Sequence, residues 1–276
     1  MNCLKNKTNC REAILLVAFG STVNSSAHLA YDNIEKQITY AYPDAKIYWA
    51  YSSRFMLKHF AKKNIKKFDI EQALEQIIAD DITKLTVQSV YFNIGKEHIK
   101  LCEKLQNLIE EKQYNLTEIK LGLPLLINDQ DVGEFVANIL ADVPIQTDRE
   151  EAIVFIMHGS VSGYGEKIFN KLQCQFKAIN ENYFMTSIEG QHRFDECVKN
   201  LALKKSLHKI YLVPLLIAAG FHAKKDIAGN EANSLLSMIH YENKELEIIP
   251  LLKGLGEYND IAQMFIQRIK DANGFL

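Results

Sequence analysis

The chain has 276 residues, of which 47% are hydrophobic and 24% are charged, and its formal net charge is -2. That length is enough for one large or two medium-sized α/β domains. Lys and Arg form no long basic stripe with interleaved aromatic residues, so nucleic acid is not an expected partner. The first ten residues lack the apolar stretch of a secretory signal, and no later run approaches the length of a membrane span. We therefore expect a cytoplasmic protein without a membrane partner.

The five cysteines are scattered along the chain and include no C-x-x-C pair. This distribution suits reduced thiols better than a disulfide framework or a zinc cluster. Cysteine chemistry is therefore not expected to carry the function.

Strand and helix patterns alternate in the first half of the chain. Apolar, strand-like runs occupy residues 13–19, 46–51, 85–91 and 119–126. Helical spacing occupies residues 26–42, 55–80, 95–112 and 129–140, with interruptions expected at Asn64 and Asp69. This alternation predicts a parallel sheet with right-handed crossovers. Pro124 indicates an edge strand or a strand end, and residues 144–151 are polar enough for a linker.

The pattern of the first half then repeats. Three pairs of segments correspond in the same order, namely residues 14–21 with 153–160, 87–95 with 212–220, and 123–126 with 249–252. We predict an α/β fold of two similar lobes, each a parallel sheet flanked by helices, with a cleft between them and boundaries at 1–128 and 129–276. The alternative is that every parallel α/β protein repeats strand and helix pairs without duplication.

The repeat provides an internal control for each candidate residue of the second half. An apolar, β-branched run ends at His158, where the first half has Phe19. Glu189 is matched with Ser52, and His222 is matched with Glu97. His158, Glu189 and His222 each follow a predicted parallel strand, and the carboxyl ends of such strands converge on one crevice.

Two imidazoles and one carboxylate form a three-ligand metal set with an open coordination position. Such nitrogen and oxygen donors suit Co, Fe, Ni or Zn better than Ca or Mg. The alternative for Glu189 is a surface carboxylate, and for His222 a histidine at a helix start. His192 could reach the same crevice as a substitute ligand or as a partner of a ligand. The remaining histidines are expected to be solvated: His28, His59, His98, His208 and His240.

Several motifs in order resemble one known family over nearly the whole chain. They are the opening Leu-Leu-Val-Ala-Phe-Gly-Ser run, Val-Gln-Ser before Asn-Ile-Gly, Leu-Gly-Leu-Pro-Leu-Leu, His158-Gly159, Ile-Glu189-Gly, Ala-Gly-Phe-His222-Ala and Gly-Leu-Gly-Glu. The chain thereby resembles the anaerobic-type sirohydrochlorin cobaltochelatases of cobalamin biosynthesis, in the class II chelatase group that also contains protoporphyrin ferrochelatase. The resemblance implies two lobes facing a tetrapyrrole cleft, with His158, Glu189 and His222 as metal-binding and catalytic residues. It implies Co2+ as a substrate, insertion into sirohydrochlorin or precorrin-2, and no organic cofactor.

Three departures from the family pattern bear on specificity. The family usually has an acidic residue where this chain has Phe221, and Tyr-Pro where this chain has Gln191-His192. Lys224 and Lys225 stand where an Asn is usual. These departures put the metal preference and the exact tetrapyrrole in doubt.

Metal insertion removes two pyrrole protons, so the site needs a base beside the metal. Imidazole can serve because it titrates near neutrality, and His158 is our choice for the principal base, with Glu189 assisting. A polycarboxylate macrocycle also needs cations and hydrogen-bond donors at the cleft. The candidate substrate-binding residues are Ser21, Arg54, Lys96, Ser160, Lys224 and Lys225. For each of the four cations, the alternative is an ordinary solvated charge.

Two other functions stay open at this point. The protein could be an iron or nickel chelatase acting on a related tetrapyrrole, because the ligand set does not separate these metals. It could instead be a carrier that binds a tetrapyrrole or metal without insertion. A metal-dependent hydrolase is less well supported, since no nucleophile motif is present, and the sequence leaves the oligomeric state open, a homo-oligomer included.

Overall fold

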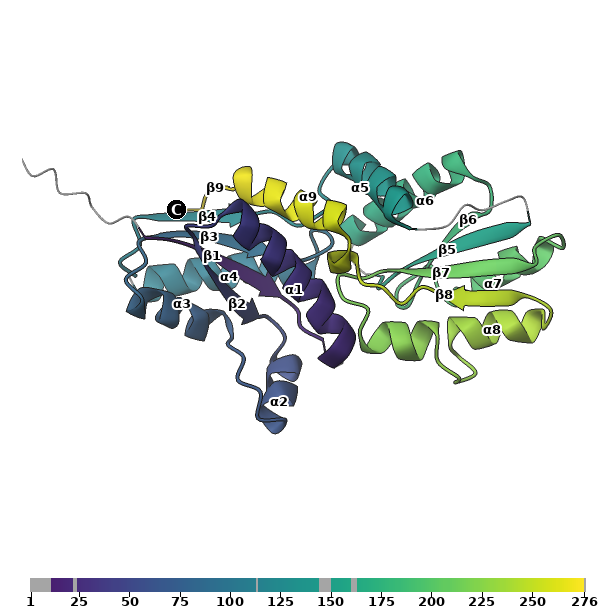
Figure 1. Ribbon diagram of the computed structural model, residues 1–276, viewed down its shortest axis with the longest axis horizontal. Helices are drawn as coiled ribbons and strands as arrows, with labels where there is room; N and C mark the ends of the chain where they lie inside the picture. The colour runs from purple at the N-terminus through teal and green to yellow at the C-terminus, as the bar shows by residue number, and fades with distance from the viewer. Residues whose placement is uncertain (1–10, 22–23, 113, 144–149, 160–162, 276) are drawn as a thin grey trace, which may run out of the picture.

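The computed structural model describes residues 11–21, 24–112, 114–143, 150–159 and 163–275. The chain forms two separate sheets that lie side by side along the long axis of the molecule, with helices packed around each (Figure 1). This confirms the predicted α/β fold with parallel sheets flanked by helices. Within the described residues, no helix is both long and apolar enough to span a bilayer.

The first sheet has the strand order β2-β1-β3-β4-β9. Its strands are β1 (Glu12–Ala18), β2 (Lys46–Tyr51), β3 (Lys84–Ser89), β4 (Glu118–Gly122) and β9 (Asn273–Gly274). The pairs formed by β1 to β4 are parallel, and β9 lies antiparallel to β4. The helices between these strands are α1 (Asn24–Ala41), α2 (Arg54–Lys62), α3 (Ile70–Ala79) and α4 (Lys96–Lys112).

The second sheet is parallel throughout and has the strand order β6-β5-β7-β8. Its strands are β5 (Glu151–Met157), β6 (Tyr183–Ser187), β7 (Lys209–Leu215) and β8 (Glu247–Pro250). The helical elements that follow β5 in the chain are α6 (Gly163–Ile179), α7 (Phe194–Leu203), the π-helical turn η1 (Ala223–Ile227), α8 (Leu235–Glu242), the 3-10 turn η2 (Leu255–Glu257) and α9 (Asn259–Lys270). Every residue of β5 is buried, which agrees with the apolar run that follows Glu151.

The expected interruptions of the helical region after β2 are confirmed. Asn64 has a positive φ of 57°, a left-handed conformation that ends helical geometry and that Asn tolerates better than most residues. Asp69 then caps α3 by accepting a hydrogen bond from the backbone N–H of Gln72, whose side chain in turn accepts from the N–H of Asp69. Pro124 lies beyond the end of β4. Of the expected linker, residues 144–149 lie outside the described residues, and Glu151 is already the first residue of β5.

The two sheets share the order of their first four strands, and they share the turn after the first of these. Gly20 and Gly159, which follow β1 and β5, both adopt left-handed conformations with φ of 101° and 91°. These equivalent turns support the predicted duplication.

The strand register corrects two of the matches made from the sequence. Ala18 and Met157 are equivalent residues of β1 and β5. Ala18 pairs with Tyr51 and Met157 pairs with Ser187, so Tyr51 and Ser187 correspond. Glu189 lies two residues after Ser187 and therefore corresponds to Ser53 and not to Ser52. The third segment match was also wrong. Val87 pairs with Leu121 while its counterpart Leu212 pairs with Pro250, so Pro250 corresponds to Leu121 and not to Pro124.

The helix that follows the fourth strand of each sheet packs on the other half of the molecule. Helix α5 (Asp129–Asp142) follows β4 but packs against α6, whereas α9 follows β8 and packs against α1, β3 and β4 (Figure 1). The chain therefore crosses between the sheets twice, and its last strand completes the first sheet. The division into residues 1–128 and 129–276 stays a prediction.

A buried ion pair joins the two exchanged helices. Arg268 of α9 lies 2.5 Å from the carboxylate of Asp131 on α5, and their side chains are 12% and 10% exposed. Arg268 also donates to the carbonyl of Leu125 at 2.9 Å. The second carboxylate oxygen of Asp131 accepts from the N–H groups of Ile127 and Asn128, so one side chain both caps α5 and ties it to α9.

We expect Arg268→Met to lower the free energy of unfolding by about 3 kcal/mol, because removing one partner leaves a buried charge without compensation. Arg11→Met is the matched control, since the ion pair of Arg11 with Asp81 is 53% and 87% exposed and should contribute less than about 1 kcal/mol. Urea denaturation of both variants measures the difference. Equal losses of unfolding free energy in the two variants would show that the ion pair between α5 and α9 stabilises the fold no more than an exposed pair does.

Candidate functional site

The candidate site lies where the strands of the second sheet end. His158 comes directly after β5, and Gly159 then turns the chain in a left-handed conformation. The backbone N–H of Glu189 donates to the carbonyl of His158 at 2.8 Å. A Cβ on Gly159 would lie 1.8 Å from the carbonyl oxygen of Glu189, so glycine is required both for the turn and for this close approach.

The structure brings His158 and His222 together. Their ring centroids are 4.9 Å apart and the ring planes are nearly perpendicular, at 87°. His158 is delivered by the end of β5, and His222 by the segment between β7 and η1. Two imidazoles at adjacent strand ends can present two nitrogen donors to one metal ion.

Asp226 fixes the orientation of His222. The Nδ1 atom of His222 lies 2.7 Å from Oδ2 of Asp226, and a carboxylate oxygen can only accept, so Nδ1 carries the proton. In the neutral ring, Nε2 then keeps its lone pair for a metal ion. The two residues are joined by the π-helical turn η1, an irregularity that often occurs at functional sites. Asp226 was not among the predicted site residues, although its position four residues after His222 was a usable signal.

Glu189 is not assembled with the two histidines. Its side chain is exposed, and within the described ranges no three His, Cys, Asp or Glu side chains lie where they could hold a metal ion together. The backbone of Glu189 is nevertheless fixed beside His158 by the hydrogen bond described above. The three-ligand set stays a prediction, and completing it requires movement of the Glu189 side chain.

The matched positions of the first half carry different chemistry. Phe19 follows β1 and is 47% exposed, and Ser53 caps α2 by accepting from the N–H of Met56. Glu97, in the first turn of α4, forms an exposed ion pair with Lys100 at 3.3 Å. No imidazole occupies any of these positions, so the histidine pair belongs to the second half.

The predicted substrate-binding residues are dispersed around the strand ends. Arg54 and Lys96 are exposed and begin α2 and α4, and Lys224 and Lys225 are exposed on η1. Ser160 lies outside the described residues. Their roles in binding stay predictions.

Ser21 instead makes a close contact between the two halves. A Cβ on Gly220 would come within 2.0 Å of the Ser21 hydroxyl oxygen, so the loop after β1 touches the loop that leads to His222. The first half is thereby held against the candidate site.

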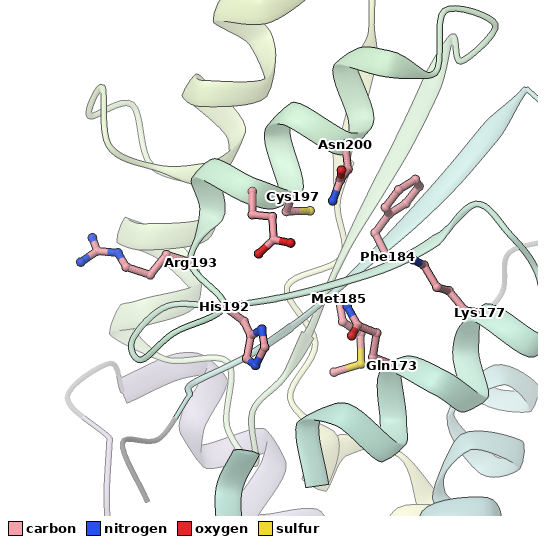
Figure 2. Close-up of a pocket in the computed structure, with 9 residues that line it drawn as sticks. Gln173, Lys177, Phe184, Met185, His192, Arg193, Cys197 and Asn200 are labelled. Carbon is pink, nitrogen blue, oxygen red and sulfur yellow. The ribbon is translucent and has the colours of Figure 1, made fainter. Parts of the chain in front are cut away.

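His192 has a structural partner away from the histidine pair. Its Nε2 atom lies 2.7 Å from Glu166 of α6, and its ring stacks on Phe169 with centroids 3.9 Å apart. It also lines a pocket between α6 and α7 beside β6, together with Arg193 and Cys197 (Figure 2). None of the three predicted metal ligands lines that pocket. Burial raises the pKa of the Cys197 thiol to about 12, so this thiol is not a ready nucleophile.

The expectation that the remaining histidines are solvated was partly wrong. His28, His208 and His240 are exposed, but His59 is half-buried and His98 is only 5% exposed. His98 lies on the inner face of α4, where its Nε2 is 3.6 Å from the sulfur of Cys102 and its Nδ1 has no hydrogen-bond partner among the described residues. Burial lowers its pKa because desolvation disfavours the charged ring.

This lowered pKa predicts an acid sensitivity of the fold. Below about pH 6.5, the ordinary value for histidine, the unfolded chain takes up a proton at His98 while the folded chain does not, so stability is lost as pH falls. The contribution should reach at most about 1.4 kcal/mol for each pH unit. Chemical denaturation at pH 7.5 and 5.5 should show a smaller loss for His98→Leu than for the wild type. His240→Gln, at an exposed position, is the control and should keep the wild-type difference.

The turn at Gly159 generates a second prediction. Gly159→Ala should weaken Co2+ binding by more than about tenfold, because the new Cβ would displace the backbone of Glu189 from His158. Gly163→Ala is the control, since a Cβ there meets nothing within 4 Å. Isothermal titration with Co2+ compares the two. If Gly159→Ala keeps wild-type affinity for Co2+ and circular dichroism shows an intact fold, metal binding does not depend on this turn.

Comparison with known proteins gives one family and several relatives. The family model described as cobalt chelatase (CbiK) matches residues 12–274. Sirohydrochlorin cobaltochelatase CbiKC of Nitratidesulfovibrio vulgaris is 25% identical over 262 residues, which cover 95% of this chain and 90% of the relative. The sirohydrochlorin cobaltochelatase of Salmonella typhimurium is 23% identical over 266 residues, which cover 95% of this chain and 96% of the relative.

Solved structures show the same fold. SirB from Bacillus subtilis with Fe3+ superposes with a TM-score of 0.66 at 14% identity, covering 95% of both chains. SirB from Bacillus subtilis subspecies spizizenii in complex with cobalt gives a TM-score of 0.60 at 14% identity, covering 95% of this chain and 94% of that one. At such identities the likeness concerns the fold.

Proposed function

Because this chain belongs to the cobalt chelatase (CbiK) family, we propose that it inserts Co2+ into sirohydrochlorin, or into precorrin-2, during cobalamin synthesis in the cytoplasm. The observation that carries the proposal is the pair of imidazoles at the strand ends of the second sheet, His158 and His222, with ring centroids 4.9 Å apart. The names of both curated relatives, sirohydrochlorin cobaltochelatases, support the choice of substrates. Metal and tetrapyrrole are both substrates in this proposal, and no organic cofactor takes part.

The two histidines have different surroundings, which suggests different roles. The ring of His222 is held by Asp226, so its Nε2 is oriented as a metal ligand. Within the described part of the chain, the hydrogen-bonding contact of His158 is the carbonyl of its neighbour Gly159, at 3.5 Å. His158 is exposed and can turn toward an incoming substrate. We assign His158 as the base: it leaves the metal ion and then accepts a pyrrole proton on the ring nitrogen that is freed.

The Glu189 carboxylate completes the cation site in the proposed mechanism. A divalent ion held by two neutral imidazoles keeps its full charge, and one carboxylate lowers it while leaving positions open for ring nitrogens. As each ring nitrogen takes a coordination position, a protein ligand leaves. An exposed, movable carboxylate is suited to being the first to leave.

His158→Ala and His222→Ala should each lower kcat for insertion by at least about 10²–10⁴-fold, because each removes a positioned base or ligand. Glu97→Ala is the matched control, because Glu97 is the first-half counterpart of His222 and lies in the first turn of α4. It should change Co2+ affinity little, whereas Glu189→Ala should weaken it strongly. Isothermal titration and the insertion rate measure the two effects. Equal losses of affinity at Glu97 and Glu189 would mean that the metal site bridges both halves.

The test of the function itself is the absorbance change on mixing metal-free sirohydrochlorin, Co2+ and the protein. An insertion rate above the uncatalysed control shows a chelatase, whereas binding without a faster rate shows a carrier. Comparing kcat/KM for Co2+, Fe2+ and Ni2+ then decides the metal. A higher value for iron or nickel would contradict the cobalt assignment.

A further inference from the structure

Helix α2 and the loop after it form an insertion that the second half of the molecule lacks. In the second half, the chain passes from Glu189 at the end of β6 to Phe194, the first residue of α7. In the first half, α2 and its loop separate the corresponding Ser53 from the start of α3 at Ile70. Figure 1 shows α2 projecting from the first sheet beyond the end of β2. Ile70 lies 17 positions after Ser53, whereas Phe194 lies five positions after Glu189, so α2 and its loop, residues 54–67, contain an addition of twelve residues to the repeated unit.

This insertion is strongly basic. Residues 54–67 contain six Lys and Arg residues and no Asp or Glu, in a chain whose net charge is -2. They are Arg54, Lys58, Lys62, Lys63, Lys66 and Lys67, and all except the half-buried Lys67 are exposed. Lys66 and Lys67 lie over the rings of Phe68 and Tyr51. Six cations with no acidic residue among them create a positive potential over this surface.

The charges follow one side of the helix. Arg54, Lys58 and Lys62 are spaced four residues apart, so they lie in a row, and like charges at this spacing destabilise a helix. Arg54 also stands in the first turn, where the helix dipole disfavours a cation. The opposite side carries the buried Met56 and Phe60, which fix the helix to the body of the protein. The basic row is thus kept at a cost to local stability.

Packing connects α2 to the candidate site through a short series of contacts. A Cβ on Gly20 would lie 3.1 Å from Cβ of Met56, so the first turn of α2 packs on the turn after β1. The neighbouring Ser21 packs against Gly220, two residues before His222. Phe55, in the first turn of α2, is 72% exposed and leaves an apolar ring beside Arg54. The helix that carries the basic row is therefore connected, through Gly20 and Ser21, to the loop that carries His222.

We propose that the basic face of α2, with its following loop, is a capture surface for the carboxylate groups of the tetrapyrrole. This inference rests on the proposed function, because it takes a macrocycle with many carboxylate side chains as the substrate. Long-range attraction raises the rate of encounter, and the row of cations guides the anion toward the strand ends. This surface captures the tetrapyrrole, whereas His158 and His222 bind the metal ion and His158 accepts a proton.

The test compares two triple variants that remove the same charge. One is Lys58→Gln with Lys62→Gln and Lys63→Gln on α2 and its C-terminal end. The other is Lys199→Gln with Lys205→Gln and Lys244→Gln, three exposed lysines on or after α7 and α8. At low salt, the α2 variant should lose about tenfold in kcat/KM for sirohydrochlorin, mainly as a higher KM, and the control variant should lose little. The difference should shrink at high salt, where the screening length falls to a few ångströms.

Direct binding separates this proposal from the function on which it rests. Fluorescence titration with metal-free uroporphyrin, whose side chains are all carboxylates, should show weaker binding by the α2 variant but not by the control. Mesoporphyrin, which carries few carboxylates, should show little difference. If no protein inserts cobalt but uroporphyrin binding still depends on α2, the proposed function fails and the capture surface stands. If the two variants bind uroporphyrin equally and have equal kcat/KM at low salt, α2 is not the capture surface, and its charge serves a macromolecular partner instead.

Discussion

The ion pair between Arg268 and Asp131 holds together an arrangement on which the candidate site depends. It joins α9, which packs on the first half, to α5, which packs on the second. Because each half contributes a helix to the other, the two sheets cannot separate without unpacking both helices. This fixes the loops at the strand ends against one another, including the contact of Ser21 with Gly220 beside His222. The geometry of the site is therefore a property of the whole chain and not of one lobe.

The site is only partly organised for a metal ion. His222 is oriented by Asp226 and lies against His158, while Glu189 has a fixed backbone and an exposed side chain. Such an arrangement suits a protein that must release its metal to another ligand, since a closed set of ligands would hold the ion too firmly. The fixed imidazole of His222 and the movable side chains of His158 and Glu189 divide the tasks of capture and release between different residues.

The sequence predicted features that depend on local chemistry, and it failed where chain segments meet in space. Asn64 and Asp69 ended and began helices as expected, because their backbone preferences are local. Glu189 was matched one residue away from its counterpart, since no motif anchors the register at the ends of β2 and β6. His98 was expected to be solvated, because one helix does not reveal which of its faces will be covered. The predicted boundary at residue 129 placed α5 with the second half, but the packing of α9 on the first half was not predicted, because an apolar face indicates burial without saying against which sheet.

The exchange of α9 also constrains the order in which the molecule can be built. Strands β1 to β4 leave the ribosome early, yet the helix that covers α1, β3 and β4 is synthesised only after the strands of the second sheet. Until α9 has been synthesised, the apolar residues of the first half on which it packs stay exposed. This period includes the synthesis of β5 to β8. The position of α9 in the chain therefore sets how long this apolar surface of the first half stays uncovered during synthesis.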